Sequence, residues 1–376
     1  MKLCIATNEV GKPSERFVEN HIKNLFGGQT CVIHRSGHTH LAPSFKISYQ
    51  FETELPTFAN KLFTFYKWKR YKVSDIPTYA EQQKIRDFLK QEHVSAVLAE
   101  FGPIGCLMYP IVTMIDLPIY TYFRGYDATL LLNNSRVRGT YRRLIPKMDG
   151  IFAVSPHLLE NLKAAGVQWK QAHVIPSGVN TNAFKPEKNK SKNPLELISV
   201  GRFVEKKSPL LTIRAFSKLL SINPDIHMTM IGDGRLFTEA KEISVKLQIS
   251  QKITFMGAQP HHVIRDKLSK ASIFLLHSVT TEDGNMEGFP SAVQEAMASG
   301  VAIVSTRHGG IINFIEHERN GLLVDEHDLE GYVEQVQRLI LDEELRSELA
   351  GNARRDAVNF FDRDKLYRKL ESIICS

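Results

Sequence analysis

Short apolar stretches alternate with longer helical patterns along the whole chain. In the first half the apolar stretches cover 3–6, 30–34, 96–99, 119–122, 150–154 and 173–175. In the second half they cover 195–200, 227–231, 252–255, 273–276, 302–305 and 321–324. Short strands separated by helices are typical of parallel sheets that helices cover on both faces. The pattern therefore predicts an α/β fold with parallel sheets.

A polar run interrupts this alternation at 184–194, where Pro186 and Pro194 flank a sequence rich in lysine and asparagine. Such a run is typical of a linker. The length of 376 residues suits two domains of about 180 residues each. We therefore expect one domain over 1–183 and a second over 184–359, followed by an amphipathic helix at 363–375.

The stretch 101–123 is apolar apart from Asp116 and could be taken for a membrane span. Pro103, Pro110 and Pro118 interrupt it, and a backbone in lipid must keep its hydrogen bonds. We predict a loop, a short buried helix and a buried strand here.

The first residues, 1–8, contain too short an apolar run for a signal peptide and predict a first strand. Cys4, Cys31, Cys106 and Cys375 have no metal-ligand or redox spacing. Scattered cysteines favour a reducing compartment without a disulfide framework. We expect a cytoplasmic protein.

Positive charge is concentrated in the first half of the chain. Residues 1–186 carry 23 Lys and Arg against 14 Asp and Glu, a net charge of +9, whereas 187–376 carry 25 against 27, a net −2. The segment 60–72 interleaves aromatic residues with five cations, which suits either a membrane interface or a solvated helix with a packed aromatic face. These features predict peripheral contact with an anionic membrane at the inner face of the cytoplasmic membrane. No nucleic-acid reader motif accompanies the charge, so we expect no nucleic-acid partner.

Glu287 and Glu295 stand with seven residues between them, where Pro290 suits a first helical turn and Gly300 the position after the last. The pattern places Glu287 in a loop at the mouth of a short helix and Glu295 inside that helix. Eight residues of helical rise span roughly 12 Å, about the distance from sugar to ribose in a nucleotide-diphosphate sugar. Two glutamates at this spacing also occur by chance in many helices.

Backbone N–H groups near Gly288 and Phe289 are expected at the start of this helix, where such groups bind anions. One segment could thus hold hexose hydroxyls, a diphosphate and ribose hydroxyls together.

The run around the two glutamates carries the sequences Gly288-Phe-Pro, Glu295-Ala-Met-Ala-Ser-Gly and Thr306-Arg-His-Gly-Gly. On these motifs the chain resembles the retaining glycosyltransferases of group 1, with a Glu-seven-Glu motif and a GT-B fold. The likeness is greatest to bacterial exopolysaccharide enzymes of the colanic acid and amylovoran type. The resemblance implies two Rossmann-like, doubly wound domains that face a cleft, with the C-terminal helix, 360–376, packing back on the first domain.

It further implies transfer of a sugar from a nucleotide-diphosphate sugar to a saccharide acceptor with retained anomeric configuration. We expect this acceptor to be lipid-linked. Glu287 would contact the transferred sugar. The alternatives on the same architecture are a nucleotide-sugar epimerase and a non-catalytic subunit of a polysaccharide assembly complex.

Arg202 and Lys207 follow a strand and precede Ser208 and Pro209, which suit the cap and first residue of a helix. Two cations at the carboxyl end of a parallel sheet stand where α/β proteins bind ligands. In the resembled family the matching pair holds the diphosphate leaving group, whose growing charge fixed cations stabilise. The alternative is an exposed basic turn, the reading we favour for Lys206.

Gly232 and Gly257 lie at strand ends in the second half. The missing side chains would allow close approach of a base and ribose, and the resembled family binds its nucleotide here. Simple turn geometry is the alternative.

Arg124 and Asp127 also follow a strand, in the sequence Arg-Gly-Tyr-Asp. The resembled family usually has histidine where this chain has Arg124. Arginine cannot act as a base near neutral pH, so we expect it to bind a phosphate or the substrate. Asp127 is expected to contact the sugar or to orient Arg124, and a structural ion pair between the two is the alternative.

Glu15 and Glu100 follow the first and third strands of the first half and are expected to face the acceptor. Capping of the first helix by Ser14 and Glu15 is the alternative.

We expect no cofactor and no metal. Asp362 and Asp364 form an Asp-x-Asp triplet, but residues two apart on a helix do not face each other. His261 and His262 have no cysteine or carboxylate partner at ligand spacing.

Overall fold

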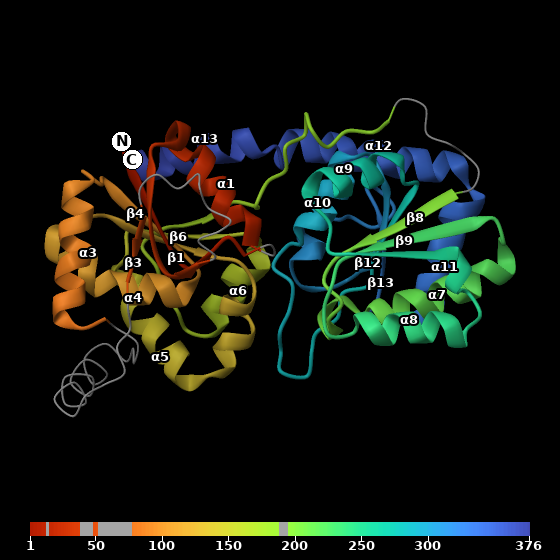
Figure 1. The fold of residues 1–376 in the computed structure, drawn as a ribbon, viewed down its shortest axis with the longest axis horizontal. Helices are drawn as coiled ribbons and strands as arrows, with labels where there is room; N and C mark the ends of the chain where they lie inside the picture. Colours follow the sequence, from red (N-terminus) through yellow and green to blue (C-terminus); the bar gives the residue numbers. More distant parts are fainter. Residues whose placement is uncertain (13–14, 38–47, 52–76, 188–194) are drawn as a thin grey trace. The chain divides into compact units, whose positions relative to one another are not determined.

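The computed structural model describes residues 1–12, 15–37, 48–51, 77–187 and 195–376 (Figure 1). The described chain divides into two compact units. Unit 1 comprises 1–175 and 367–376, and unit 2 comprises 176–366. The segment 60–72, on which the membrane-surface prediction rests, lies outside the described residues.

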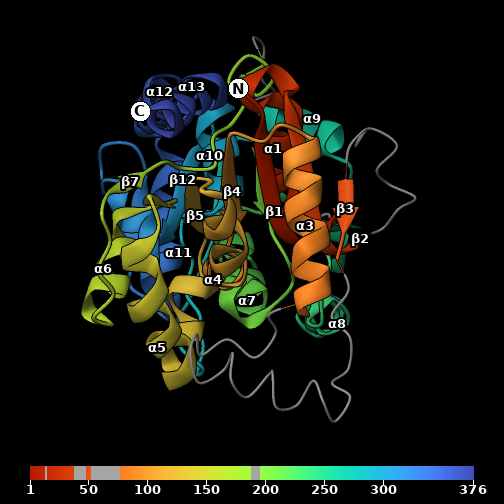
Figure 2. The same cartoon turned by 90° about the vertical axis from the view of Figure 1, so that its left-hand side faces the viewer.

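Unit 1 is built around a parallel sheet with the strand order β3-β2-β1-β4-β5-β6-β7 (Figure 2). The strands are β1 (Leu3–Val10), β2 (Thr30–Gly37), β3 (Ser48–Gln50), β4 (Ala96–Glu100), β5 (Ile119–Phe123), β6 (Gly150–Ala153) and β7 (Ala172–Val174). The helices between them are α1 (Arg16–Asn24), α3 (Tyr79–Gln91), α4 (Gly102–Val112), α5 (Ser135–Leu144) and α6 (Pro156–Ala164).

The stretch 101–123 forms the buried helix α4, a short 3-10 turn and the strand β5, as predicted. Pro103 is accommodated in the first turn of α4, where its missing N–H has no helical partner to lose. Among the described residues, no helix combines the length and apolarity needed to cross a membrane.

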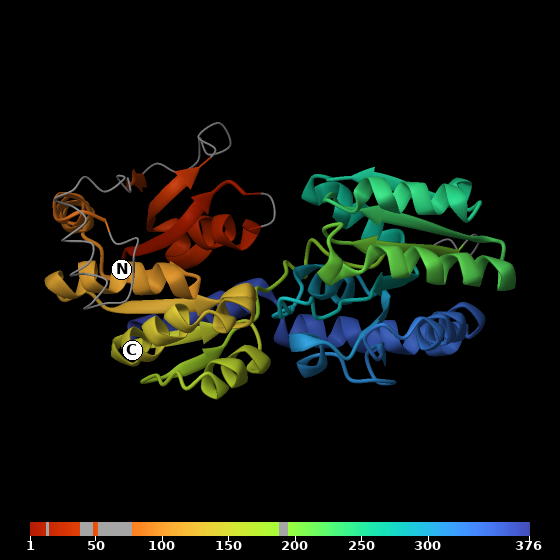
Figure 3. The same cartoon turned by 90° about the horizontal axis from the view of Figure 1, so that it is seen from below.

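Unit 2 contains a second parallel sheet, of order β10-β9-β8-β11-β12-β13. Its strands and helices are coloured from green to blue in Figure 3. Its strands are β8 (Leu195–Val200), β9 (Ile226–Ile231), β10 (Ile253–Gly257), β11 (Ile273–Leu276), β12 (Ala302–Thr306) and β13 (Leu322–Val324). Its helices are α7 (Pro209–Ile222), α8 (Phe237–Lys246), α9 (His261–Lys270), α10 (Ser291–Ala298), α11 (Leu329–Leu341) and α12 (Glu343–Phe360).

Each unit reverses strand order at its first strand, since β1 lies between β2 and β4 and β8 lies between β9 and β11. This is the Rossmann-type order, in which ligands bind beyond the carboxyl ends of the strands at the reversal. Both units are therefore doubly wound, as the family resemblance implied, and their sheets are parallel, as the alternation of strands and helices predicted.

The helix α13 (Arg363–Cys375) begins in unit 2 and continues into unit 1. Within unit 1, the Glu371 Oε1 atom accepts the Phe26 N–H at 2.6 Å, and Tyr367 packs edge-on against His21 at 5.2 Å between ring centroids. Residues 367–376 thus belong to unit 1 by contact, although unit 2 precedes them in sequence.

Gly105 allows α4 to lie directly against β5. A Cβ at Gly105 would lie 1.9 Å from Thr121 Oγ1, and Thr121 is fully buried. We expect Gly105→Ala to destabilise unit 1 by about 1–3 kcal/mol through overpacking. The free energy of unfolding in urea measures this loss.

Gly139→Ala in α5 is the matched control, because no atom lies within 4 Å of its added Cβ. There, alanine should stabilise the helix by up to about 1 kcal/mol. Equal effects of the two substitutions would contradict the packing argument.

Candidate active site

The candidate site of unit 2 lies at the strand reversal, where the chain leaves the carboxyl ends of β8 and β11. After β8 the loop is closed by backbone bonds from Phe203 N–H to Asp233 O (2.9 Å) and from Leu236 N–H to Phe203 O (3.0 Å). A Cβ at Gly232 would lie 1.9 Å from Gly201 O, and one at Gly234 would lie 2.5 Å from Phe203 O. Gly232 and Gly234 are thus required by contact between the two loops.

Gly257 has a left-handed backbone with φ of +66°, and open space surrounds the position of its missing Cβ. Its carbonyl accepts the Gly232 N–H at 2.9 Å. The nucleotide-binding roles assigned to Gly232 and Gly257 stay predictions.

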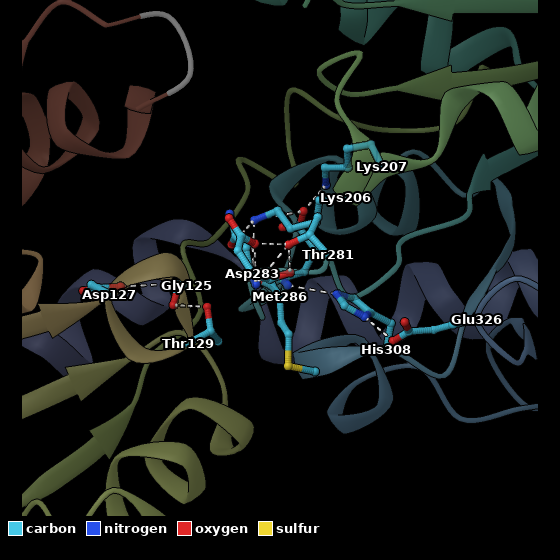
Figure 4. Close-up of polar contacts among 12 residues, drawn as sticks. Gly125, Asp127, Thr129, Lys206, Lys207, Thr281, Asp283, Met286, His308 and Glu326 are labelled. Carbon is cyan, nitrogen blue, oxygen red and sulfur yellow. Dashed lines mark hydrogen bonds and ion pairs between the residues drawn. The ribbon is translucent and has the colours of Figure 1, made fainter. Parts of the chain in front are cut away.

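Lys206 and Lys207 converge on the Glu287 carboxylate. The Nζ atoms lie 3.5 Å and 3.1 Å, respectively, from Glu287 Oε1. Lys206 Nζ also donates to Asn285 Oδ1 at 3.1 Å and to the Met286 carbonyl at 3.3 Å (Figure 4). The expectation that Lys206 lies in an exposed turn is wrong, because its side chain is buried and held by the loop that precedes Glu287.

Arg202 is exposed, and within the described part of the chain no hydrogen bond or ion pair holds its guanidinium. Pro209 begins α7 as predicted. Ser208 occupies the cap position, but its backbone is left-handed (φ +40°) and its side chain makes no capping hydrogen bond.

Glu287 is ionised throughout the physiological range. Burial acts to raise its pKa, but the nearby Lys207 and Lys206 ammonium groups and His308 outweigh burial and lower it to about 2. The short contact between Glu287 Oε1 and Lys207 is ionic in character, because the geometry leaves this buried oxygen without a directed hydrogen bond. The oxygen therefore retains capacity to accept a hydrogen bond.

The loop after β12 holds the backbone of Glu287. Its N–H donates to His308 Nε2 at 3.0 Å, and its carbonyl accepts the Gly310 N–H at 3.1 Å. His308 Nδ1 in turn lies 2.6 Å from Glu326 Oε1 (Figure 4). The sequence pointed to this loop through Thr306-Arg-His-Gly-Gly but did not single out His308 or Glu326.

Two N–H groups follow Glu287, at Gly288 and Phe289. Within the described residues no hydrogen bond reaches either of them, although both residues are buried. They lie just before α10, which begins at Ser291 with Pro290 as its cap, and Gly300 follows the helix with φ of +61°.

Glu295 lies inside α10, as predicted, and is partly exposed. Its Oε1 atom lies 2.8 Å from His261 Nε2 at the start of α9. In the described residues no group of three or more His, Cys, Asp or Glu could hold a metal ion.

Asp127 in unit 1 organises the loops that follow β4 and β5. Its Oδ1 atom accepts the N–H groups of Arg124 (3.0 Å) and Gly125 (2.9 Å), and Oδ2 accepts the Gly102 N–H (3.0 Å). Thr129 Oγ1 also donates to the Gly125 carbonyl (Figure 4). Burial raises the pKa of Asp127, although these N–H groups act to lower it.

Arg124 is buried and its ion-pair partner is Glu100. Its Nε and Nη2 atoms donate to Glu100 Oε2 at 3.0 Å and 2.8 Å, and its guanidinium lies 3.5 Å and 4.1 Å from the ring centroids of Tyr122 and Phe17. The alternative of an ion pair with Asp127 is wrong, because Asp127 contacts the backbone of Arg124. The predicted phosphate or substrate contact of Arg124 stays a prediction.

Glu100 is fully buried at the end of β4, with Oε1 lying 2.6 Å from His21 Nδ1. Burial lowers the pKa of His21, so this contact is a hydrogen bond from a neutral imidazole. Burial acts to raise the pKa of Glu100, but Arg124 and His21 outweigh it and lower the pKa. The structure thus places Glu100 in an internal network with His21 and Arg124, and its predicted acceptor contact stays a prediction.

Glu15 precedes α1 and makes no side-chain capping bond. It pairs with Lys12 at 2.7 Å and remains partly exposed. Asp362 accepts from Thr181 Oγ1 at 2.6 Å and from the Lys365 N–H at 3.2 Å, which accounts for its place at the start of α13.

The two doubly wound units define a GT-B fold. The glycosyltransferase of Rickettsia africae ESF-5 matches with a TM-score of 0.79 at 18% identity over 99% of this chain and 97% of that one. Anabaena Alr3699/HepE, solved in complex with UDP, matches with a TM-score of 0.81 at 15% identity over the full length of both chains.

Two glycosyltransferase family models match the sequence. Residues 180–356 match the model of group 1 glycosyl transferases, and residues 48–183 match that of glycosyltransferase family 4. The chain thus carries a group 1 glycosyltransferase domain over 180–356 and is a glycosyltransferase enzyme.

The sequence is also similar to known glycosyltransferases. The colanic acid biosynthesis glycosyltransferase WcaL of Escherichia coli (strain K12) is 29% identical over 281 residues, which is 74% of this chain and 69% of WcaL. The amylovoran biosynthesis glycosyltransferase AmsK of Erwinia amylovora is 29% identical over 280 residues, with the same shares of each chain.

His277, at the end of β11, generates a prediction about pH. It is fully buried, and its Nε2 atom accepts the His327 N–H at 3.0 Å. Burial, followed by His327, lowers the pKa of His277 from 6.5 to about 4. Below pH 6.5, His277 binds a proton in the unfolded chain but stays unprotonated in the folded chain. The free energy of unfolding therefore falls as the pH drops towards 4.

We expect His277 to lower the free energy of unfolding by about 3 kcal/mol between pH 6.5 and 4, at about 1.4 kcal/mol for each unit of pKa shift. Urea unfolding at several pH values measures it. His277→Asn should flatten the dependence, whereas His262→Asn, at an exposed site, should leave it as in the wild type. An unchanged slope in His277→Asn would refute the assignment.

Proposed function

We propose that the protein is a retaining glycosyltransferase that moves a sugar from a nucleotide-diphosphate sugar to a saccharide acceptor in surface or exopolysaccharide biosynthesis. The observation that carries the proposal is the buried Glu287 carboxylate, ionised between Lys206 and Lys207 at the strand reversal of unit 2. A carboxylate there can accept hydrogen bonds from sugar hydroxyls, and cations beside it can bind a diphosphate.

The diphosphate would be held by Lys207, by the exposed Arg202, and by the N–H groups of Gly288 and Phe289. Backbone donors and cations fixed in advance stabilise the charge that develops on a departing phosphate. Glu287 offsets only part of the positive charge of Lys206, Lys207 and Arg202. The negative charge of a bound diphosphate would offset the rest.

The nucleoside would lie against Gly232 and Gly257, with Glu295 on the ribose hydroxyls. Gly257 supports this placement, since the space at its missing Cβ is open. Glu295 is partly exposed, and its contact with His261 leaves one carboxylate oxygen for a second interaction. Alr3699/HepE was solved in complex with UDP, so UDP-sugars are the first donors to test.

In the transfer step the bond from the anomeric carbon to the phosphate oxygen breaks. The bond from that carbon to the acceptor hydroxyl oxygen forms on the same face. The acceptor proton passes to the departing phosphate oxygen, so no carboxylate nucleophile is needed. Glu287 would position the sugar, because an ionised carboxylate beside two lysines cannot donate a proton.

Unit 1 would supply the acceptor site through Asp127, Arg124 and the partly exposed Glu15. The names of the WcaL and AmsK relatives point to colanic acid and amylovoran synthesis, which supports a saccharide acceptor. We propose that this acceptor is lipid-linked. The excess positive charge of the first half supports peripheral contact with an anionic membrane.

Glu287→Gln tests the site directly. The substitution keeps the size of the side chain but removes the charge that pairs with Lys206 and Lys207. We expect turnover to fall about 100-fold or more, the scale seen when a group that positions the reacting atoms is lost. Glu344→Gln, an exposed glutamate on α12, is the control and should retain full activity. Near-normal transfer by Glu287→Gln would overturn the assignment.

A thermal-shift screen of nucleotide-diphosphate sugars identifies the donor. The correct donor should raise the melting temperature of the wild type, and Lys207→Met should abolish most of the shift. The shift should be the same with and without EDTA, because we propose that donor binding needs no metal. Stabilisation that requires a divalent ion would contradict metal independence. Consumption of donor without any acceptor would favour an epimerase instead.

A further inference from the structure

The loop after β12 makes hydrogen bonds to both the N–H and the carbonyl of Glu287. His308 Nε2 accepts its N–H at 3.0 Å, and Gly310 N–H donates to its carbonyl at 3.1 Å. Between them, Gly309 has φ of +48°, and a Cβ there would lie 2.4 Å from the Glu287 carbonyl oxygen. The carboxylate that faces Lys206 and Lys207 is therefore placed by its main chain as well as by its charge.

The hydrogen-bond network determines the tautomer of His308. A ring nitrogen that accepts an N–H carries no proton, so the proton of the neutral imidazole must be on Nδ1. Nδ1 donates to Glu326 Oε1 at 2.6 Å. Glu326 is fixed in turn, since its Oε2 accepts the Thr280 N–H at 2.7 Å and its Oε1 accepts Thr280 Oγ1 at 3.0 Å.

We propose that His308 and Glu326 are positioning residues, which fix Glu287 for sugar transfer through a neutral imidazole that carries its proton on Nδ1. The inference rests on the proposed function of Glu287. His308 is fully buried and both ring nitrogens are engaged, so it is not placed to exchange a proton with a substrate.

Protonation of Nε2 would put two donors face to face, because the Glu287 N–H points at the same atom. Burial lowers the pKa of His308 below its usual 6.5, and Lys207 acts in the same direction. Glu326 and Glu287 act to raise it, and His277 lies near enough to interact. Transfer should accordingly be lost on the acid side, as the pH falls through the pKa of His308.

Three variants separate positioning from simple folding. His308→Phe removes the acceptor and should lower kcat about 100-fold, the cost of a small misplacement of a reacting group. His308→Gln can present an oxygen where Nε2 stood, so it should recover most of that loss. Glutamine at position 308 cannot be protonated in this pH range. The kcat of His308→Gln should therefore not show the fall below pH 6.5 that we expect for the wild type.

His317→Phe is the matched control. His317 also accepts a backbone N–H through its ring, at 3.0 Å from Leu323, but it does not contact Glu287. Its loss should lower the melting temperature without lowering kcat. A His308→Phe enzyme within about threefold of the wild type, or a His308→Gln enzyme that keeps the acid limb, overturns the proposal.

Nitrogen-15 NMR of the histidine rings tests the tautomer without any assay of transfer. The His308 signals, assigned by their absence in His308→Gln, should show a protonated Nδ1 and an unprotonated Nε2 at neutral pH. Signals of an Nε2–H tautomer or an imidazolium overturn the inference even in an active enzyme. The correct tautomer in a protein that transfers no sugar from any donor would instead refute the proposed function alone.

Discussion

The site of unit 2 depends on one constraint, the burial of an ionised carboxylate. Glu287 is removed from water, which disfavours its charged form, and two ammonium groups within 3.5 Å restore that form. An uncompensated buried charge would cost several kcal/mol. The loops after β8, β11 and β12 must therefore keep their relative positions for the carboxylate to remain ionised, which ties the strand order to the chemistry.

Much of the fold was predictable because apolar strands have a strong local signature. Each strand predicted in the sequence is present, with its ends shifted by a few residues, and α13 has the predicted bounds. β3 was not predicted, since Ser48-Tyr-Gln is short and largely exposed. The boundary between the units lies at 175/176, before the polar run, because 176–187 contact unit 2. Contacts of that kind leave no local signal.

The sequence predicted the position of a site residue where that position follows from nearby residues. It did not predict contacts with residues that are distant in sequence. The loop position of Glu287 and the helical position of Glu295 followed from Pro290 and Gly300. Burial of Lys206 did not, because the loop that covers it comes some 80 residues later. The alternative considered for Arg124 was an ion pair with the nearby Asp127, but the side chain reaches back to Glu100 on the adjacent strand.

The helix α13 also bears on biosynthesis. Residues 367–376 are part of unit 1 but follow the whole of unit 2 in sequence. Domains generally fold as units while the ribosome is still extending the chain. Unit 1 cannot complete its contacts until 367–376 have been translated, because His21 and Phe26 have their partners in that segment. Of the two units, the one whose main part is translated earlier is thus completed later.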